Sequence, residues 1–162
     1  MELVDLRREE CLTLLRAGVI GRLVYTEAAL PAAHPVTYYL DRDEVVFRTG
    51  NGGSLGAATR HHVVGFEIDG YDSGTSTGWS VLGVGMAYEV TDPGRLAVLA
   101  ERMPPPWAPD RSGHVIAIPL QRLTGRRLRV SAAPDSTTNP TGAGPGAPRS
   151  GFSRGPQGKP PT

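Results

Sequence analysis

Short segments with the composition of β-strands, separated by turns, dominate the first 130 residues of this 162-residue chain. β-Branched and aromatic residues favour strands, and they predict strands at 19–26, 30–40, 44–49, 63–69, 78–91, 114–120 and 123–130. The helices predicted near 6–17, 54–59 and 93–102 do not alternate regularly with these strands, as βαβ units would require. The pattern therefore favours an antiparallel β-barrel or sandwich with helices at its ends over a doubly wound fold.

Capping residues set the expected limits of the first and last helices. Asp5 is a suitable N-cap for the first helix, and Gly18 suits the position just after its end. Apolar residues three to five positions apart give this helix an inward face that contains Leu6, Cys11, Leu14 and Leu15. Asp92 as N-cap and Pro93 at the first position predict the last helix. We interpret Cys11 as a buried structural thiol.

Glycine and proline punctuate two of the predicted strands. Pro31 and Pro35 mark 30–40 as an edge strand or a bulged one. Gly83 and Gly85 lie within 78–91, where they predict bulges or a close approach of another backbone.

The composition changes near residue 131. Residues 131–162 are rich in Pro, Gly, Ser and Thr, and Phe152 is their only large apolar side chain. Such a segment buries too little apolar area to offset the entropy cost of ordering. We therefore predict a folded domain at 1–130 and a disordered tail at 131–162.

Charge, cysteine content and hydropathy exclude several classes of partner. The formal net charge is +1, which gives no sign of a nucleic-acid partner. The chain has one cysteine, so an intramolecular disulfide is impossible and a reducing compartment is expected. No run approaches the 18 apolar residues of a membrane span, and the N-terminus lacks the pattern of a secretory signal. We expect a cytoplasmic protein with no membrane contact.

Four segments, in order, resemble the pyridoxamine 5′-phosphate oxidase-like flavoproteins, particularly the small branch that includes nitroimidazole-resistance-type proteins. They are Glu9-Glu10-Cys11-Leu12 through Gly21-Arg22-Leu23; Pro35-Val36-Thr37-Tyr38 with Val45-Val46-Phe47-Arg48-Thr49; residues 78–90, GWSVLGVGMAYEV; and residues 123–128, LTGRRL. The resemblance implies a mainly β, six-stranded antiparallel split β-barrel. It also implies a homodimer with FMN in the subunit interface.

One contiguous stretch has the chemistry of a phosphate site. Arg48 offers a planar fork of donors at a strand end, and Thr49 adds a hydroxyl and a backbone N–H. Gly53 and Ser54 belong to a loop that leads into the short predicted helix, whose N-terminal end favours an anion. An ordinary turn with a surface arginine is the alternative, and the resemblance favours the phosphate of FMN.

This stretch departs from the family pattern at Ser54, where relatives commonly have lysine. A charge-assisted hydrogen bond contributes roughly 1.5–3 kcal/mol. The substitution is therefore expected to weaken FMN binding by about one to two decades, unless Arg60, His61 or a partner subunit compensates.

The remaining predicted flavin contacts come from three other strands. The resemblance assigns the ring edge to the strand that contains Pro35, Val36, Thr37 and Tyr38. It matches Trp79 and Ser80 to a segment that approaches the flavin, often from the other subunit. Trp79 offers a stacking face, although a core or interface tryptophan fits equally well. Arg126 and Arg127 either reach the phosphate or the dimer interface, or lie at a solvated strand end.

The function implied is flavin-dependent hydride transfer with a small-molecule substrate, because flavin carries out this chemistry while the protein supplies position and electrostatics. Two alternatives use the same fold. One is the deazaflavin coenzyme F-420, for which Arg126, Arg127 and Arg129 are candidate contacts. The other is a flavin-binding or sequestering module without turnover. The four histidines lack the spacing of a metal site, so we predict no metal.

Overall fold

The computed structural model describes residues 1–50, 61–106 and 113–130. Contacts divide the chain into two units, Met1–Ser131 and Ala132–Thr162. The short helix predicted at 54–59 and the disordered tail predicted at 131–162 lie outside the described residues. In the described part, no helix is long and apolar enough to cross a membrane.

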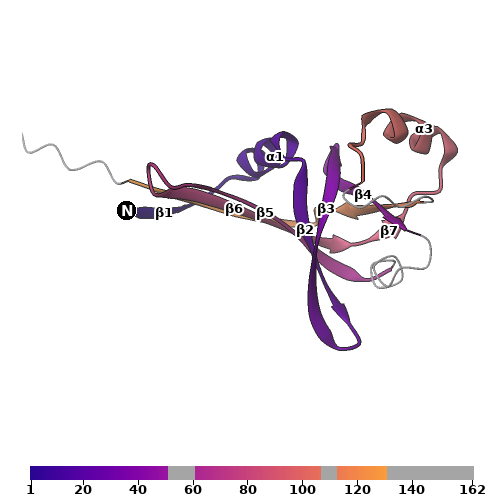
Figure 1. The fold of residues 1–162 in the computed structure, drawn as a ribbon, viewed down its shortest axis with the longest axis horizontal. Coiled ribbons are helices and arrows are strands. Elements are labelled where there is room, and N and C mark those ends of the chain that lie inside the picture. Colours follow the sequence, from indigo (N-terminus) through magenta and orange to yellow (C-terminus); the bar gives the residue numbers. More distant parts are fainter. Residues whose placement is uncertain (51–60, 107–112, 131–162) are drawn as a thin grey trace, which may run out of the picture. The chain divides into compact units, whose positions relative to one another are not determined.

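Antiparallel strands make up most of the described residues (Figure 1). In chain order the elements are β1 (Glu2–Asp5), α1 (Arg8–Ala17), β2 (Ile20–Glu27), β3 (Leu30–Asp41), β4 (Glu44–Gly50), β5 (Val63–Asp72), β6 (Thr77–Met86), β7 (Tyr88–Glu89), α3 (Pro93–Arg102), β8 (Gly113–Pro119) and β9 (Arg122–Arg129). Every strand pair is antiparallel. The mainly β, antiparallel fold class is therefore confirmed.

The strands form one sheet in the order β1-β9-β6-β5-β2-β3-β4-β8-β7. The long strand β3 joins its two parts, because residues 30–37 pair with β2 and residues 38–41 pair with β4. The sheet is not closed by pairing, since β1 and β7 are its two edges. The described residues hold nine strands, compared with the six that the resemblance implies and the seven segments predicted from composition. The two additional strands are β1 and β7.

The core lies between the inward faces of the two parts of the sheet. Strand β2 shows the alternation that produces it, with Leu23 and Tyr25 buried and Val24 exposed. The main cluster combines such residues with α1: Cys11, Leu12, Leu15, Leu23, Tyr25, Val36, Tyr38, Leu40, Val45, Phe47, Val64, Phe66, Ile68, Val81, Ala87, Ile116, Ile118 and Leu120. A second cluster packs α3 on the opposite face of β4 and β8 through Val46, Val90, Leu99, Met103 and Ala117.

The first helix begins later than its sequence suggested. The N-cap is Arg7, whose backbone N–H donates to a side-chain oxygen of Glu10 at 2.9 Å. The prediction that Asp5 caps the helix is therefore wrong. Asp5 ends β1 and lies opposite Arg126 of β9, with 3.4 Å between its Oδ1 and Arg126 Nε. The backbone of Asp5 pairs with β9, which is more than 120 residues away in the chain, and therefore cannot form the first turn of the helix.

Gly18 ends the helix as expected, but for a different reason. Its φ of −82° is accessible to any residue, so conformational freedom is not required. A Cβ at this position would instead overlap the hydroxyl oxygen of Tyr38. That hydroxyl donates to the carbonyl of Leu15 at 2.6 Å, which ties β3 to the end of α1.

The strand predicted at 78–91 is two strands. Its first part, β6, pairs with β5 and β9, whereas β7 pairs with β8 on the other part of the sheet. The break lies at Ala87, whose N–H donates to His62 O and whose carbonyl accepts from His61 N–H, both at 2.9 Å. The sequence did not indicate this change of pairing partner, because β-favouring residues continue through residues 78–91.

The close backbone approach predicted at Gly83 and Gly85 is confirmed at Gly85, whereas Gly83 meets a side chain. A Cβ on Gly85 would overlap the carbonyl oxygen of Pro119, and one on Gly83 would overlap the side chain of Leu120. Pro119 ends β8 and Leu120 follows it, so these glycines allow the two parts of the sheet to touch.

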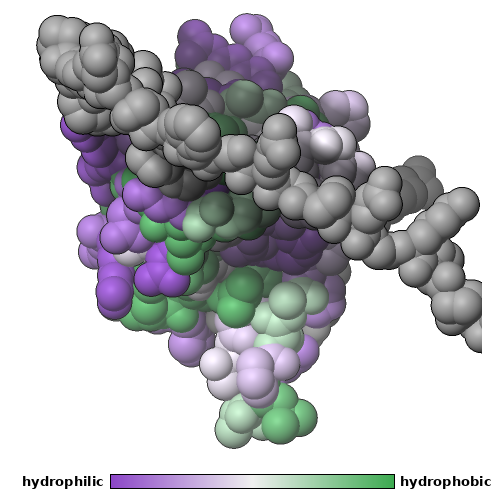
Figure 2. Space-filling model, turned by 90° about the vertical axis from the view of Figure 1, so that its left-hand side faces the viewer, coloured by the Kyte–Doolittle hydropathy of each residue, from purple (hydrophilic) through white to green (hydrophobic). Residues whose placement is uncertain are grey.

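The β2–β3 turn carries apolar side chains into solvent. Ala28 and Ala29 form the turn with φ values of 49° and 64°, a conformation that glycine and asparagine adopt more easily. Leu30 follows and is 68% exposed. This end of the hairpin is the white and green lobe at the bottom of Figure 2.

Tyr38 should make the protein sensitive to alkali. Burial raises its pKa above the ordinary value, so the folded state favours the neutral phenol. The stability that this contributes is complete below the unfolded-state pKa of about 10 and is lost as pH rises above it. We expect Tyr38→Phe to make the free energy of unfolding fall less steeply above pH 10 in urea titrations. Tyr71→Phe, at an exposed position, is the control, and an equal change in slope would contradict the assignment.

Candidate functional site

Within the described residues, the C-terminal end of β4 holds a buried hydroxyl with no hydrogen-bond partner. Thr49 points inward with Val45 and Phe47, and only 4% of its surface is exposed. Among the described residues, its Oγ1 has no hydrogen-bond partner. A buried polar atom left unpaired costs roughly 1–3 kcal/mol, so this atom is suited to bind a polar group that enters from the strand end.

Arg48 leaves the opposite face of the same strand. It follows Val46, which packs under α3, and it is half-buried. Within the described residues, it forms no hydrogen bond or ion pair. A ligand can therefore contact both Arg48 and Thr49 only beyond the strand end at Gly50. The other two members of the predicted phosphate site, Gly53 and Ser54, lie outside the described residues.

A histidine and a glutamate adjoin Thr49, and sequence reasoning missed both. His114 lies directly opposite Thr49 in the β4–β8 pairing, and its Nδ1 is hydrogen-bonded to Glu89 of β7. Period-2 alternation along β8 could have placed His114 on the face of Thr49. Glu89 could not have been found this way, because it joins β8 only through the break at Ala87.

The segment predicted to face the ring edge divides between two faces of β3. Val36 and Tyr38 are buried in the core, whereas Pro35 and Thr37 lie on the outer face. Thr37 Oγ1 donates to the carbonyl of Pro105 at 2.7 Å. Val36 and Tyr38 can therefore reach a ligand on the outer face only through their backbone.

Ser80 and Arg126 share the outer face with Thr37. Pairing across β2, β5, β6 and β9 places the three residues in one row. Thr37 and Ser80 are three strands apart, which corresponds to about 14 Å. Arg126 is adjacent to Ser80 and forms the ion pair with Asp5.

Trp79 and Arg127 lie on the inner side at the far end of the same strands. The indole lies across Gly70, where a Cβ would be 2.7 Å from its ring. Both residues line a cleft of about 460 Å³ that also contains Arg129. The described members of the predicted site thus occupy three places in one chain: the end of β4, the outer face of the sheet, and this cleft.

Comparison with known proteins identifies relatives over most of the domain. The family model described as pyridoxamine 5′-phosphate oxidase matches residues 7–127. The protein Rv0080 of Mycobacterium tuberculosis is 37% identical over 132 residues, which is 78% of this chain and 86% of that protein.

Solved structures share the fold. The FAD binding protein from Mycobacterium smegmatis is 31% identical, with a TM-score of 0.67 over 78% of this chain and 98% of that chain. A candidate 5-nitroimidazole antibiotic resistance protein from Bacteroides thetaiotaomicron is 11% identical, with a TM-score of 0.61 over 78% of this chain and 89% of that one, and shows the fold alone. The resemblance seen in the sequence is therefore confirmed, and the chain belongs to the pyridoxamine 5′-phosphate oxidase family.

Proposed function

We propose that the protein binds a flavin at the C-terminal end of β4 and uses it as a redox cofactor for a small substrate. The unpaired, buried Oγ1 of Thr49 is the observation that carries the proposal. A family relative 31% identical to this chain is named an FAD binding protein, which supports a flavin as the ligand. FMN is the flavin we expect, because its terminal phosphate carries nearly two negative charges and suits a single hydroxyl-and-guanidinium site.

The chain's own residues would bind and orient this cofactor. Thr49 Oγ1 would donate to a phosphate oxygen, and Arg48 would balance charge from the other side of the strand end. His114, held by Glu89, lies beside Thr49 and would keep this end of the strand polar. Flavin, when bound, supplies hydride transfer, so the protein need not provide a separate acid–base pair.

A homodimer with the flavin in its interface is part of this proposal. The outer face of β2, β5 and β6 exposes Ile20, Val24, Val63, Leu82 and Met86. Exposed apolar patches of this kind commonly mark protein contacts. Pro35, Thr37, Ser80 and Arg126 lie on that face, where a second copy could enclose a ring. Sedimentation equilibrium of the purified chain with and without FMN tests this part.

Substitution of Thr49 tests the flavin site directly. We expect the purified full chain to bind FMN with a flavin absorbance spectrum, and Thr49→Val to weaken binding by about tenfold or more, the effect of one charge-assisted hydrogen bond. The same variant should unfold at an equal or higher urea concentration than the parent, because it removes an unpaired buried hydroxyl. Titration calorimetry and urea unfolding provide the two measurements.

Thr26→Val is the matched control, since Thr26 is an exposed strand threonine on β2. It should leave the FMN affinity unchanged. FAD is titrated in parallel, and the flavin extracted from the purified protein is identified by chromatography. Absence of binding by either flavin would reject the proposal, and an unchanged affinity in Thr49→Val would reject the site.

A further inference from the structure

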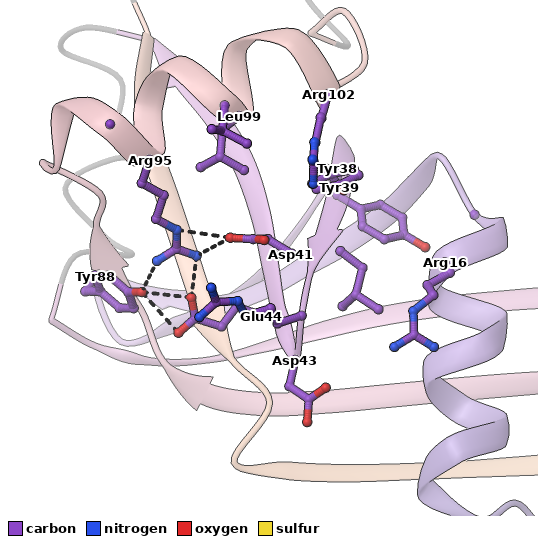
Figure 3. A pocket seen from close by; sticks show the side chains of 15 residues that line it. Arg16, Tyr38, Tyr39, Asp41, Asp43, Glu44, Tyr88, Arg95, Leu99 and Arg102 are labelled. Carbon is purple, nitrogen blue, oxygen red and sulfur yellow. Dashed lines mark hydrogen bonds and ion pairs between the residues drawn. The ribbon is translucent and has the colours of Figure 1, made fainter.

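A second cleft lies at the other end of β4, away from Thr49. It has a volume of about 1100 Å³ and lies between the end of α1, the β3–β4 turn and α3 (Figure 3). Of the residues predicted for the flavin, only Tyr38 lines it, and the hydroxyl of Tyr38 is already bonded to Leu15 O. The cleft is therefore separate from the proposed flavin site.

The acidic side chains of this cleft already have cationic partners. Arg95 donates to Asp41 at 2.8 and 3.0 Å and to Glu44 at 2.5 Å. It also donates to the hydroxyl of Tyr88 at 2.7 Å, and that hydroxyl donates to Glu44 (Figure 3). Asp43 pairs with Arg8 at 3.2 Å. These carboxylates are thus partly neutralised within the protein.

Three further arginines line the cleft without such partners. Arg16 comes from α1, Arg42 from the β3–β4 turn and Arg102 from α3. None of them forms a hydrogen bond or ion pair within the described part of the chain. In Figure 3 Arg102 extends downward from α3 and Arg16 extends from α1 at the right. Three exposed arginines from separate elements therefore line one space.

The backbone of Arg42 adds a second observation. Its φ is 58°, in the left-handed region that a side chain other than glycine or asparagine adopts at a cost. The position is in a two-residue turn between Asp41 and Glu44, where glycine would be the ordinary choice. Strained backbone positions cluster at functional sites, so the conformation of Arg42 is consistent with a role for its side chain in this cleft.

The rest of the lining is apolar. Val98 is 47% exposed on α3, and Leu99, Leu40 and Tyr39 form the wall behind it. Partly apolar pockets with a few convergent polar groups are typical of small-molecule sites. This wall would be shielded from water by an apolar body but not by an inorganic ion.

We propose that this cleft binds a small organic anion, a phosphate monoester or similarly charged group attached to an apolar body. Guanidinium groups match phosphate oxygens with two parallel hydrogen bonds, and three unpaired arginines of the described residues line the space. The apolar part would lie against Val98 and Tyr39. The phosphate would compensate the charge of Arg16, Arg42 and Arg102.

Titration with 1-naphthyl phosphate tests the proposal on the full-length protein loaded with one equivalent of FMN. This amount fills the flavin site without an excess that would compete for the cleft, since FMN is itself a phosphate monoester. Calorimetry should detect one site per chain, and the neutral compound 1-naphthol should bind at least tenfold more weakly. In two-dimensional ¹⁵N–¹H spectra the amide signals of Gly18 and Gly94, which line the cleft, should shift, while that of Gly65 should not.

Charge-removing substitutions assign the site. Arg16→Gln and Arg102→Gln should each weaken the probe about tenfold, the effect of losing one charge-assisted hydrogen bond. Arg122→Gln, at an exposed arginine of β9 outside the cleft, should leave the affinity unchanged. Absence of probe binding, or an equal loss in all three variants, would overturn the proposal. Because flavin affinity is read separately through Thr49→Val, failure here is distinguishable from failure of the proposed function.

Discussion

Gly85→Ala should lower the free energy of unfolding by about 3 kcal/mol, the upper range for overpacking in a close-packed interior. The new methyl group would overlap the carbonyl oxygen of Pro119, which is backbone and cannot rotate away as a flexible side chain would. The two parts of the sheet would then have to separate where β6 passes the end of β8. Urea unfolding at a fixed protein concentration measures the loss.

Gly65→Ala is the matched control, because Gly65 is a strand glycine beside Val64, the residue that pairs with Gly85. A Cβ there would make ordinary contacts, the nearest at 3.4 Å from Val24 Cβ. We expect its effect to be within about 0.5 kcal/mol of zero, as for most surface changes. Equal effects of the two substitutions would show that β6 and β8 do not approach as closely as described.

Arg95→Met should cost about 2–3 kcal/mol of stability at neutral pH. The side chains of Arg95, Asp41 and Glu44 are only 27%, 22% and 24% exposed. Partial burial acts to lower the pKa of Arg95, but its hydrogen bonds to Glu44, Tyr88 and Asp41 outweigh this and keep it charged. Without the guanidinium, two neighbouring carboxylates lose their cation, a change that is strongly destabilising in buried pairs and smaller here because of partial exposure.

Arg102→Met, on the same helix, provides the comparison. Arg102 makes no hydrogen bond or ion pair within the described residues, so its loss should change the unfolding free energy by less than about 0.5 kcal/mol. Adding Asp41→Asn to Arg95→Met should restore part of the stability, because it removes one uncompensated charge. If the double variant is no more stable than Arg95→Met, the network is not the cause of the loss.

The sequence predicted correctly those elements that depend on neighbouring residues alone. Alternating side chains in β2 and the capped helix at Asp92, whose side chain accepts from Arg95 N–H at 2.7 Å, are local features. Errors arose where a distant partner decides the structure. Asp5 was assigned to a helix because nothing in its neighbourhood shows β9, and Ala87 was placed inside a strand because nothing nearby shows β8.

The candidate flavin site shows the same division. The sequence indicated Thr49 and Arg48 as ligands, but the structure shows that they leave opposite faces of β4 and that Thr49 Oγ1 is buried and unpaired. His114 and Glu89 join this end only through the pairing of β4, β8 and β7. No local pattern indicates the contact between His114 and Glu89, because they are 25 positions apart in the chain.

The sequence by itself determined the family, the antiparallel β class and the close backbone approach at Gly85, because each depends on residue type, order or period along the chain. Only the tertiary structure decided the strand order, the change of partner at Ala87 and the cleft formed by Arg16, Arg42 and Arg102. The physical reason is that these features come from segments brought together by burial of a common core. Which segments pack together depends on side chains from the whole domain, so a local sequence pattern cannot predict it.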